Sequence, residues 1–274
     1  MEKNRQNYRM RDWQQSLLPS FRSRTLPTTP IDEVAMNKGI RYFNFPIYLL
    51  RGFLVNSRQV LDNICDYCLY EHTLKFDDND NDEDEAIVQR MKLAMKFYNI
   101  KLADPIASFE RGQKLYATLP VSCPYAGLNL RIYWDYYDNQ KTDFEKACLL
   151  TFLAIKSILG NKRYCKITNK FIVSRMEGKP KVSNNISPAV QKFAKEYQLN
   201  KIKNELELNW HLVSYGKAVR GFYVSFDLTL DDLAYIAEMN REKYRSLKLK
   251  NEKKLAAQKA RERIKNEQRI SRPI

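Results

Sequence analysis

Residues 142–160 constrain the fold of this chain more than any other segment. Thr142 and Glu145 match the T-x-x-E pattern of a capping box, in which the Thr hydroxyl accepts from a backbone N–H and the Glu carboxylate reaches back to the cap. The helix that they open carries apolar side chains on most sides, and Gly160 is typical of a helix C-terminus. A helix of this kind has to be buried, so we expect the second half of the chain to surround it.

The segments after this helix predict a small α+β domain. We expect a short strand at 164–167, a helix from Thr168 to about residue 178, and a helical region at 187–208 with a break near residues 199–200. Two β-like segments, 210–215 and 219–226, surround Gly216 and predict a hairpin, and Thr229 begins a long basic helix. The order helix, strand, helix, helix, hairpin is that of a winged helix-turn-helix.

The first half is predicted to repeat part of this pattern. Residues 41–47 and 128–137 alternate like strands, and helical spacing runs through 57–74, 86–98 and 105–118. A strand followed by an apolar helix thus occurs in both halves, which favours a tandem winged helix-turn-helix within a mainly α fold with small β-hairpins (α+β). The expected divisions are a polar N-terminal arm at 1–38, a helical, winged-helix-like domain at 39–138, a winged helix-turn-helix domain at 139–228 and a basic C-terminal helix at 229–274.

The chain is strongly basic, with 47 Lys and Arg against 32 Asp and Glu, a net charge of +15. Residues 241–274 hold 13 Lys or Arg and only four Glu, whereas seven acids gather in residues 77–85. This excess indicates a polyanionic partner, the alternative being a solvated basic helix. The acidic segment predicts a surface loop, because a calcium loop would need Gly where Glu83 stands and Glu where Gln89 stands.

Few residues suit a catalytic or metal site. The eight glycines form no phosphate-binding motif, and the histidines are His72 and His211. Cys65 and Cys68, followed by His72, have a metal-like spacing, but they lie in an apolar helical stripe, which favours buried thiols. We expect no enzymatic activity, cofactor or bound metal. The enzymatic alternative is a nuclease or strand-transferase with a site that the sequence does not reveal, and for strand transfer the nucleophile could be one of the 17 tyrosines.

The compartment is predicted from three absences in the sequence. No apolar run is long enough to cross a membrane, no secretory signal follows the first residues, and five cysteines do not form a disulfide framework. We expect a soluble, cytoplasmic protein with no membrane partner.

Candidate DNA contacts lie on the predicted second helix of the helix-turn-helix, at about 195–208. Its predicted inward face consists of Leu199, Ile202, Leu206 and Trp210. The side chains predicted to face solvent are Gln198, Asn200, Lys201, Lys203 and Asn204. Asn and Gln can read adenine edges, and Lys suits guanine or phosphate. Cations predicted at the hairpin tip and beside the helices add phosphate contacts, namely Lys217, Arg220, Lys162, Arg163, Lys179 and Lys181.

Four segments of the second half carry a resemblance to a known class of protein. They read FLAIKSILG at 152–160, KITN at 166–169, SRMEG at 174–178 and RGFYVSF at 220–226. With them, residues 140–228 resemble the winged-helix replication initiators and replisome organisers of plasmids, phages and conjugative elements, which often carry two winged helices. The resemblance implies origin or operator binding without catalysis.

We therefore expect a non-enzymatic protein that binds duplex DNA and acts in replication initiation, or its control, in a mobile genetic element. The N-terminal domain is a candidate site for a protein partner or a homodimer contact. Two alternatives stay open: a subunit that holds RNA or single strands in a larger nucleoprotein complex, and a transcriptional regulator.

Overall fold

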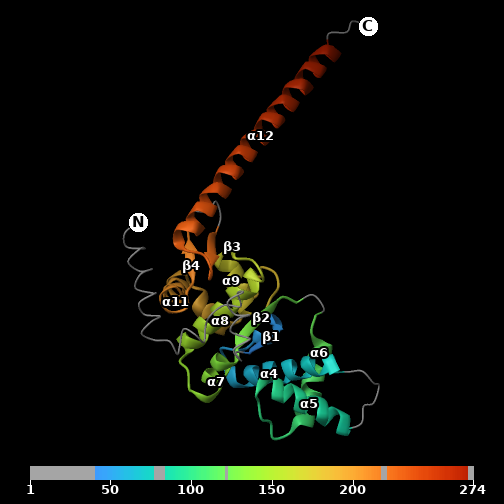
Figure 1. The fold of residues 1–274 in the computed structure, drawn as a ribbon. Helices are drawn as coiled ribbons and strands as arrows, with labels where there is room; N and C mark the ends of the chain where they lie inside the picture. The colour runs from blue at the N-terminus through green and yellow to red at the C-terminus, as the bar shows by residue number, and fades with distance from the viewer. Residues whose placement is uncertain (1–40, 77–83, 121–122, 217–220, 271–274) are drawn as a thin grey trace.

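The computed structural model describes residues 41–76, 84–120, 123–216 and 221–270. Over these ranges the chain is mostly helical and has two small antiparallel sheets, which confirms the predicted α+β class (Figure 1). The predicted N-terminal arm at 1–38 and most of the acidic loop at 77–85 lie outside the described residues. Among the described residues, no helix is long and apolar enough to span a membrane.

The first half is built around one central helix, α4. Its elements are β1 (Tyr42–Pro46), the 3-10 helix η1 (Ile47–Leu50), α4 (Ser57–Thr73), the 3-10 helix η2 (Leu74–Phe76), α5 (Asp84–Tyr98), α6 (Pro105–Thr118), β2 (Tyr125–Asn129) and α7 (Leu130–Asp138). Strands β1 and β2 pair antiparallel, with Tyr42 opposite Asn129. Helix α4 packs against α5, α6 and β1, and its buried side chains include Leu61, Ile64 and Leu69.

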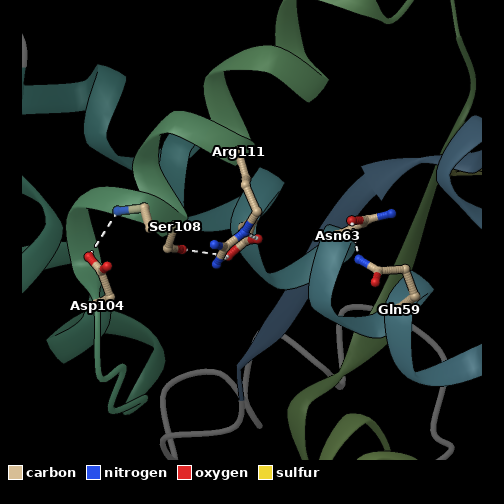
Figure 2. Close-up of polar contacts among 7 residues, drawn as sticks. Gln59, Asn63, Asp104, Ser108 and Arg111 are labelled. Carbon is tan, nitrogen blue, oxygen red and sulfur yellow. Dashed lines mark hydrogen bonds and ion pairs between the residues drawn. The ribbon is translucent and has the colours of Figure 1, made fainter.

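A buried carboxylate joins α4 to α6. Asp66 accepts hydrogen bonds from Ser108 Oγ at 2.5 Å and from Arg111 Nε at 2.7 Å. Figure 2 labels Ser108 and Arg111 on α6. The same region of α6 includes Gly112, where an added Cβ would lie 2.3 Å from the carbonyl oxygen of Asp66. The two helices therefore approach closely at a point that admits no side chain, next to an ion pair that fixes their register.

One predicted element of the first half is wrong. Residues 128–137 are predicted as a strand, but the chain forms β2 only up to Asn129 and then turns into α7. The side chain of Asn129 accepts from the N–H of Arg131 and caps this helix. A short run rich in aromatic and β-branched residues fits either periodicity, and here Tyr133 and Tyr136 are buried three residues apart, as on a helix.

The second half contains four shorter helices, a three-stranded sheet and a long final helix. Its elements are α8 (Asp143–Leu159), β3 (Tyr164–Ile167), α9 (Asn169–Met176), α10 (Pro188–Ala194), α11 (Glu196–Asn209), β4 (Val213–Tyr215), β5 (Phe222–Ser225) and α12 (Leu230–Ile270). The strand order is β3-β5-β4 and both pairings are antiparallel. Strand β5, the last in sequence, is therefore central.

Helix α8 is the buried helix that the sequence predicts. Thr142 Oγ1 accepts from the N–H of Glu145 at 3.3 Å, and the Glu145 carboxylate accepts from the N–H of Thr142 at 2.9 Å, so the capping box is complete. Eleven of the 17 residues of α8 are buried. They belong to one continuous core that extends from Phe43 to Val224 and includes residues of both halves.

The helical region at 187–208 breaks at a different residue from the one predicted. The interruption is Lys195, whose extended backbone (φ −61°, ψ 138°) separates α10 from α11, and not residues 199–200. Leu199 lies within the first turn of α11, since its N–H bonds the Lys195 carbonyl and its side chain is buried. Leu199 therefore belongs to the inward face of α11, as its spacing predicts, and only the position of the break differs.

Helix α12 packs on the sheet only at its beginning. Leu233 and Ala237 are buried against Val213, Tyr223 and Leu228. The Tyr215 hydroxyl donates to Glu238 at 3.0 Å, close to where the helix leaves the sheet. Residues 242–262 are all exposed, and Figure 1 shows the helix extending away from the rest of the molecule.

Candidate nucleic-acid interface

Helix α11 is held by an apolar face and presents a polar face to solvent. Leu199, Ile202 and Leu206 are buried, as predicted, and the following Trp210 ring lies 5.2 Å from that of Phe152 on α8. The exposed residues of α11 are Glu196, Tyr197, Asn200, Lys201 and Asn204, and the last four have the spacing i, i+3, i+4, i+7. Gln198, which is predicted to face solvent, is half-buried.

Lys203 is partly enclosed instead of fully exposed. Its Nζ lies 3.5 Å from Asn169 Oδ1 at the start of α9 and 4.7 Å from the ring centre of Phe222 on β5. Burial lowers the pKa of this ammonium, an effect that Glu207 and Glu196 oppose. Lys203 therefore marks the place where α11, the N-terminus of α9 and the hairpin meet.

Lys201 lies on the other side of the exposed face. Its Nζ is 4.8 Å from the ring centre of Phe144, in the first turn of α8, and the side chain remains exposed. The cation–π contact keeps the stem near the protein while the charge stays in water. The ammonium is thus available to an anion at the edge of the polar face.

The carboxylates of α11 are partly engaged in the fold. Glu205 accepts from Asn209 Nδ2 at 2.6 Å, and Glu207 accepts from the Ser214 hydroxyl at the start of β4. Glu196 is exposed at the beginning of the helix. The helix itself has three Glu and two Lys, so its polar face is not a basic patch, and most phosphate contacts would have to come from neighbouring elements.

The hairpin begins beside this face. Ile167 pairs with Phe222, and at Gly221 (φ +84°) an added Cβ would lie 2.1 Å from the Ile167 carbonyl oxygen. Only glycine fits there. Lys217 and Arg220, the predicted cations of the hairpin tip, lie outside the described residues.

Two predicted contacts lie at the far end of the sheet. Lys162 and Arg163 precede β3, whose first residue Tyr164 pairs with Ser225, whereas its last residue Ile167 pairs with Phe222. At about 3.3 Å per residue the two ends of β3 are roughly 10 Å apart. Arg163 is also ion-paired with Asp227 at 2.7 Å. The structure does not bring these two residues together with the polar face of α11.

Lys179 forms hydrogen bonds within its own loop. Its Nζ donates to Ser183 Oγ at 3.3 Å and to the Asn185 carbonyl, and the residue is half-buried. These bonds close the loop between α9 and α10, which Glu177 also braces by accepting from the N–H and the hydroxyl of Ser187. Lys181 in the same loop is exposed.

Sequence reasoning missed two side chains at this surface. Tyr197 is 75% exposed in the first turn of α11, and its spacing to Asn200, Lys201 and Asn204 was the available signal. Lys170 is exposed in the first turn of α9, next to the Asn169 that meets Lys203. Tyr197 lies on the same face of α11 as the predicted residues, and Lys170 follows the Asn169 that Lys203 contacts.

The cysteines of α4 behave as core residues. Cys65 and Cys68 are buried, and burial raises the pKa of Cys65 to about 12. The Cys68 thiol donates to the Asn44 carbonyl at 3.4 Å, while the His72 ring stacks on Phe97. Across the described ranges no three His, Cys, Asp or Glu side chains converge in a way that could hold a metal ion.

No family model, curated protein or solved structure matches this chain. The function proposed below therefore depends on where the chain places its own residues. The features that bear on it are the exposed face of α11, the adjoining hairpin and the distribution of charge.

Proposed function

We propose that this chain binds duplex DNA without catalysing a reaction, with residues 139–228 acting as a winged helix-turn-helix and α11 as its recognition helix. The observation that carries the proposal is the face of Asn200, Lys201 and Asn204 on a helix anchored by three core residues. Asparagine can make two hydrogen bonds to an adenine edge, and lysine suits guanine or phosphate. A recognition helix needs buried side chains that hold it in place and solvent-facing side chains that contact base edges.

The elements around α11 support the same proposal. The strand order β3-β5-β4 and the order helix, strand, helices, hairpin support a winged helix-turn-helix in which α10 is an additional short helix before α11. The hairpin between β4 and β5 would then be the wing. In the first half, β1 and β2 form a two-stranded sheet, and a second winged helix there stays a prediction.

The charge of the chain supports a polyanionic partner. The net charge of +15 includes eight Lys and Arg against three Glu in residues 242–262, all of them exposed. Cations of this kind bind phosphates without reading sequence, and each contact makes binding weaker as salt rises. A role in replication initiation or its control in a mobile element is the biological setting that we propose for this binding.

Fluorescence anisotropy with a labelled random-sequence duplex tests the proposal. We expect binding at 50 mM salt that weakens steeply by 200 mM, and no cleavage when Mg²⁺ or Mn²⁺ is added. Absence of duplex binding at low salt would contradict the proposal, and metal-dependent cleavage would replace it with a nuclease.

The second candidate, an RNA- or single-strand-binding subunit, is favoured by the exposed basic helix alone. A chain that ends at residue 240 distinguishes the two candidate functions. It keeps Leu233 and Ala237, which pack on the sheet, so it should fold. If α11 reads duplex DNA, the truncated chain retains sequence preference with a smaller salt slope. If α12 is the binding element, the truncated chain loses all binding.

A further inference from the structure

The inner face of α12 continues beyond the sheet on which the helix packs. Leu233, Tyr244 and Leu255 are eleven residues apart, and eleven residues make almost a whole number of helical turns, so the three lie on nearly one line. Leu233 is fully buried against the sheet. Tyr244 and Leu255 prolong the same line where there is no sheet to cover it.

The uncovered part of this line forms a mostly apolar stripe, which we call the α12 stripe and define as Tyr244, Leu247, Leu255 and the polar Asn251 between them. Tyr244, Leu247 and Leu255 are 53%, 57% and 56% exposed. Together with Lys248 and Glu252, the four stripe residues line a shallow, open hollow on the helix. The segment 242–262 is about 30 Å of helix. In proteins most helix stability comes from the packing of an apolar face, so a partner that covers the stripe would stabilise this segment.

The charges beside the stripe define what can cover it. Helical periodicity places Lys243, Lys250 and Lys254 along one edge. It places Arg241, Lys248 and Lys259 along the other. Lys248 has an acidic neighbour, Glu252, at 3.8 Å. A partner that fits has an apolar stripe of its own with carboxylates on both sides.

Three other occupants fit less well. A second copy would set rows of lysine against rows of lysine, and the seam would run into Lys254 and Gln258 instead of further apolar residues. Duplex DNA would satisfy the cations but offers no match for Tyr244 and the two leucines. A membrane surface calls for a broad apolar face, whereas this stripe is about one side chain wide.

We propose that the α12 stripe is a docking surface for an acidic amphipathic helix of a different protein. The partner's apolar side chains would pack into the hollow around Asn251, and its carboxylates would pair with the lysines on both edges. This surface is separate from the polar face of α11, so the inference does not depend on DNA binding.

The test uses the full chain and a labelled 21-residue synthetic peptide with Leu at heptad positions a and d and Glu at e and g. A peptide of the same composition in scrambled order serves as the charge control. We expect the ordered peptide to bind at 150 mM salt at least tenfold more tightly than the scrambled one, as measured by fluorescence anisotropy. Equal binding of both peptides would overturn the proposal, because charge alone would then explain the affinity.

Variants of α12 locate the contact. The double substitution Leu247→Ser and Leu255→Ser should weaken binding of the ordered peptide at least tenfold. Leu249→Ser is the matched control, since Leu249 is 54% exposed but lies on another side of the helix, and it should change binding less than twofold. All three residues are exposed, so far-UV circular dichroism should show the same fold in each variant. Equal losses in the two variants would overturn the proposal.

The competing occupants give distinct results in the same set of proteins. Sedimentation that shows a dimer of the full chain, abolished by Leu247→Ser with Leu255→Ser, would assign the stripe to a second copy and overturn the proposal. Binding to phosphatidylserine–phosphatidylcholine vesicles that the same variant abolishes would assign it to a membrane, with the same consequence. We expect neither, and we expect the variant to bind duplex DNA as the unaltered chain does.

Discussion

His72 is a buried base whose protonation the fold opposes. It is 5% exposed on α4, stacked on Phe97 at 4.2 Å between ring centres, and burial, with Lys75 and Arg41 nearby, lowers its pKa from 6.5 to about 4. The unfolded chain therefore takes up this proton near pH 6.5, whereas the folded chain does so only near pH 4. Stability contributed by the neutral ring is present above pH 6.5 and is lost as the pH falls toward 4.

This pH dependence can be measured against a variant without the titrating ring. Between pH 7 and pH 4.5, the unfolding free energy of the unaltered chain should fall by up to about 3 kcal/mol more than that of His72→Phe, which keeps an aromatic ring against Phe97. Urea denaturation at the two pH values measures the difference. Parallel losses in both proteins would show that His72 does not carry the effect.

Lys179 and Lys201 are similar cations with different tasks. Lys179→Met should lower the unfolding free energy by about 1 kcal/mol, because the bonds to Ser183 and the Asn185 carbonyl are lost, and leave duplex affinity unchanged. Lys201→Met should do the reverse, weakening duplex binding and reducing the salt slope by about one. Chemical denaturation and salt titration of anisotropy measure the two effects. A larger DNA defect in Lys179→Met would contradict the assignment.

At the scale of single residues, the sequence predicts which side of a helix is buried and little about what the other side meets. The spacing of Leu199, Ile202 and Leu206 is sufficient to predict the buried side of α11, because burial follows helical periodicity. The contacts of Lys203 with Asn169 and Phe222 join three separate elements. No local pattern contains that information, and so the enclosure of Lys203 was not foreseen.

At the scale of elements, the contact between α4 and α6 depends on one glycine. In Gly112→Ala the new Cβ would lie 2.3 Å from the Asp66 carbonyl oxygen and 2.6 Å from Tyr70 Cβ, so the helices would have to separate. We expect a loss of about 3 kcal/mol in unfolding free energy. Gly216→Ala is the matched control, because no atom lies within 4 Å of its added Cβ, and it should change stability by no more than about 0.5 kcal/mol. Similar urea-unfolding midpoints for the two variants would contradict the close approach of α4 and α6.

Helices predicted from their end signals begin where the sequence places them. Thr142 with Glu145, and Thr168, each supply a cap for an unpaired N–H. Helix α7 was predicted as a strand, since its aromatic residues fit both periodicities. Its helical state is set by packing in the core.

At the scale of the whole molecule, the face that we propose to read DNA is separate from the densest positive charge. The polar face of α11 belongs to the core-supported part of the second half, whereas the densest positive charge lies on the exposed length of α12. The charge composition predicts a polyanionic partner, but it does not show which surface of the protein binds that partner. The sheet order and the packing of α12 come from long-range contacts that the sequence alone does not reveal.

The central claim is that the exposed face of α11 reads duplex sequence. Selection of bound duplexes from a random pool tests it most directly, with the unaltered chain and the double variant Asn200→Ala and Asn204→Ala in parallel. Both side chains are exposed, so the variant should fold normally and keep its salt-dependent affinity for random duplex. We expect a motif containing A·T pairs with the unaltered chain and loss of that preference in the variant. No enriched motif, or the same motif in both proteins, would contradict the account.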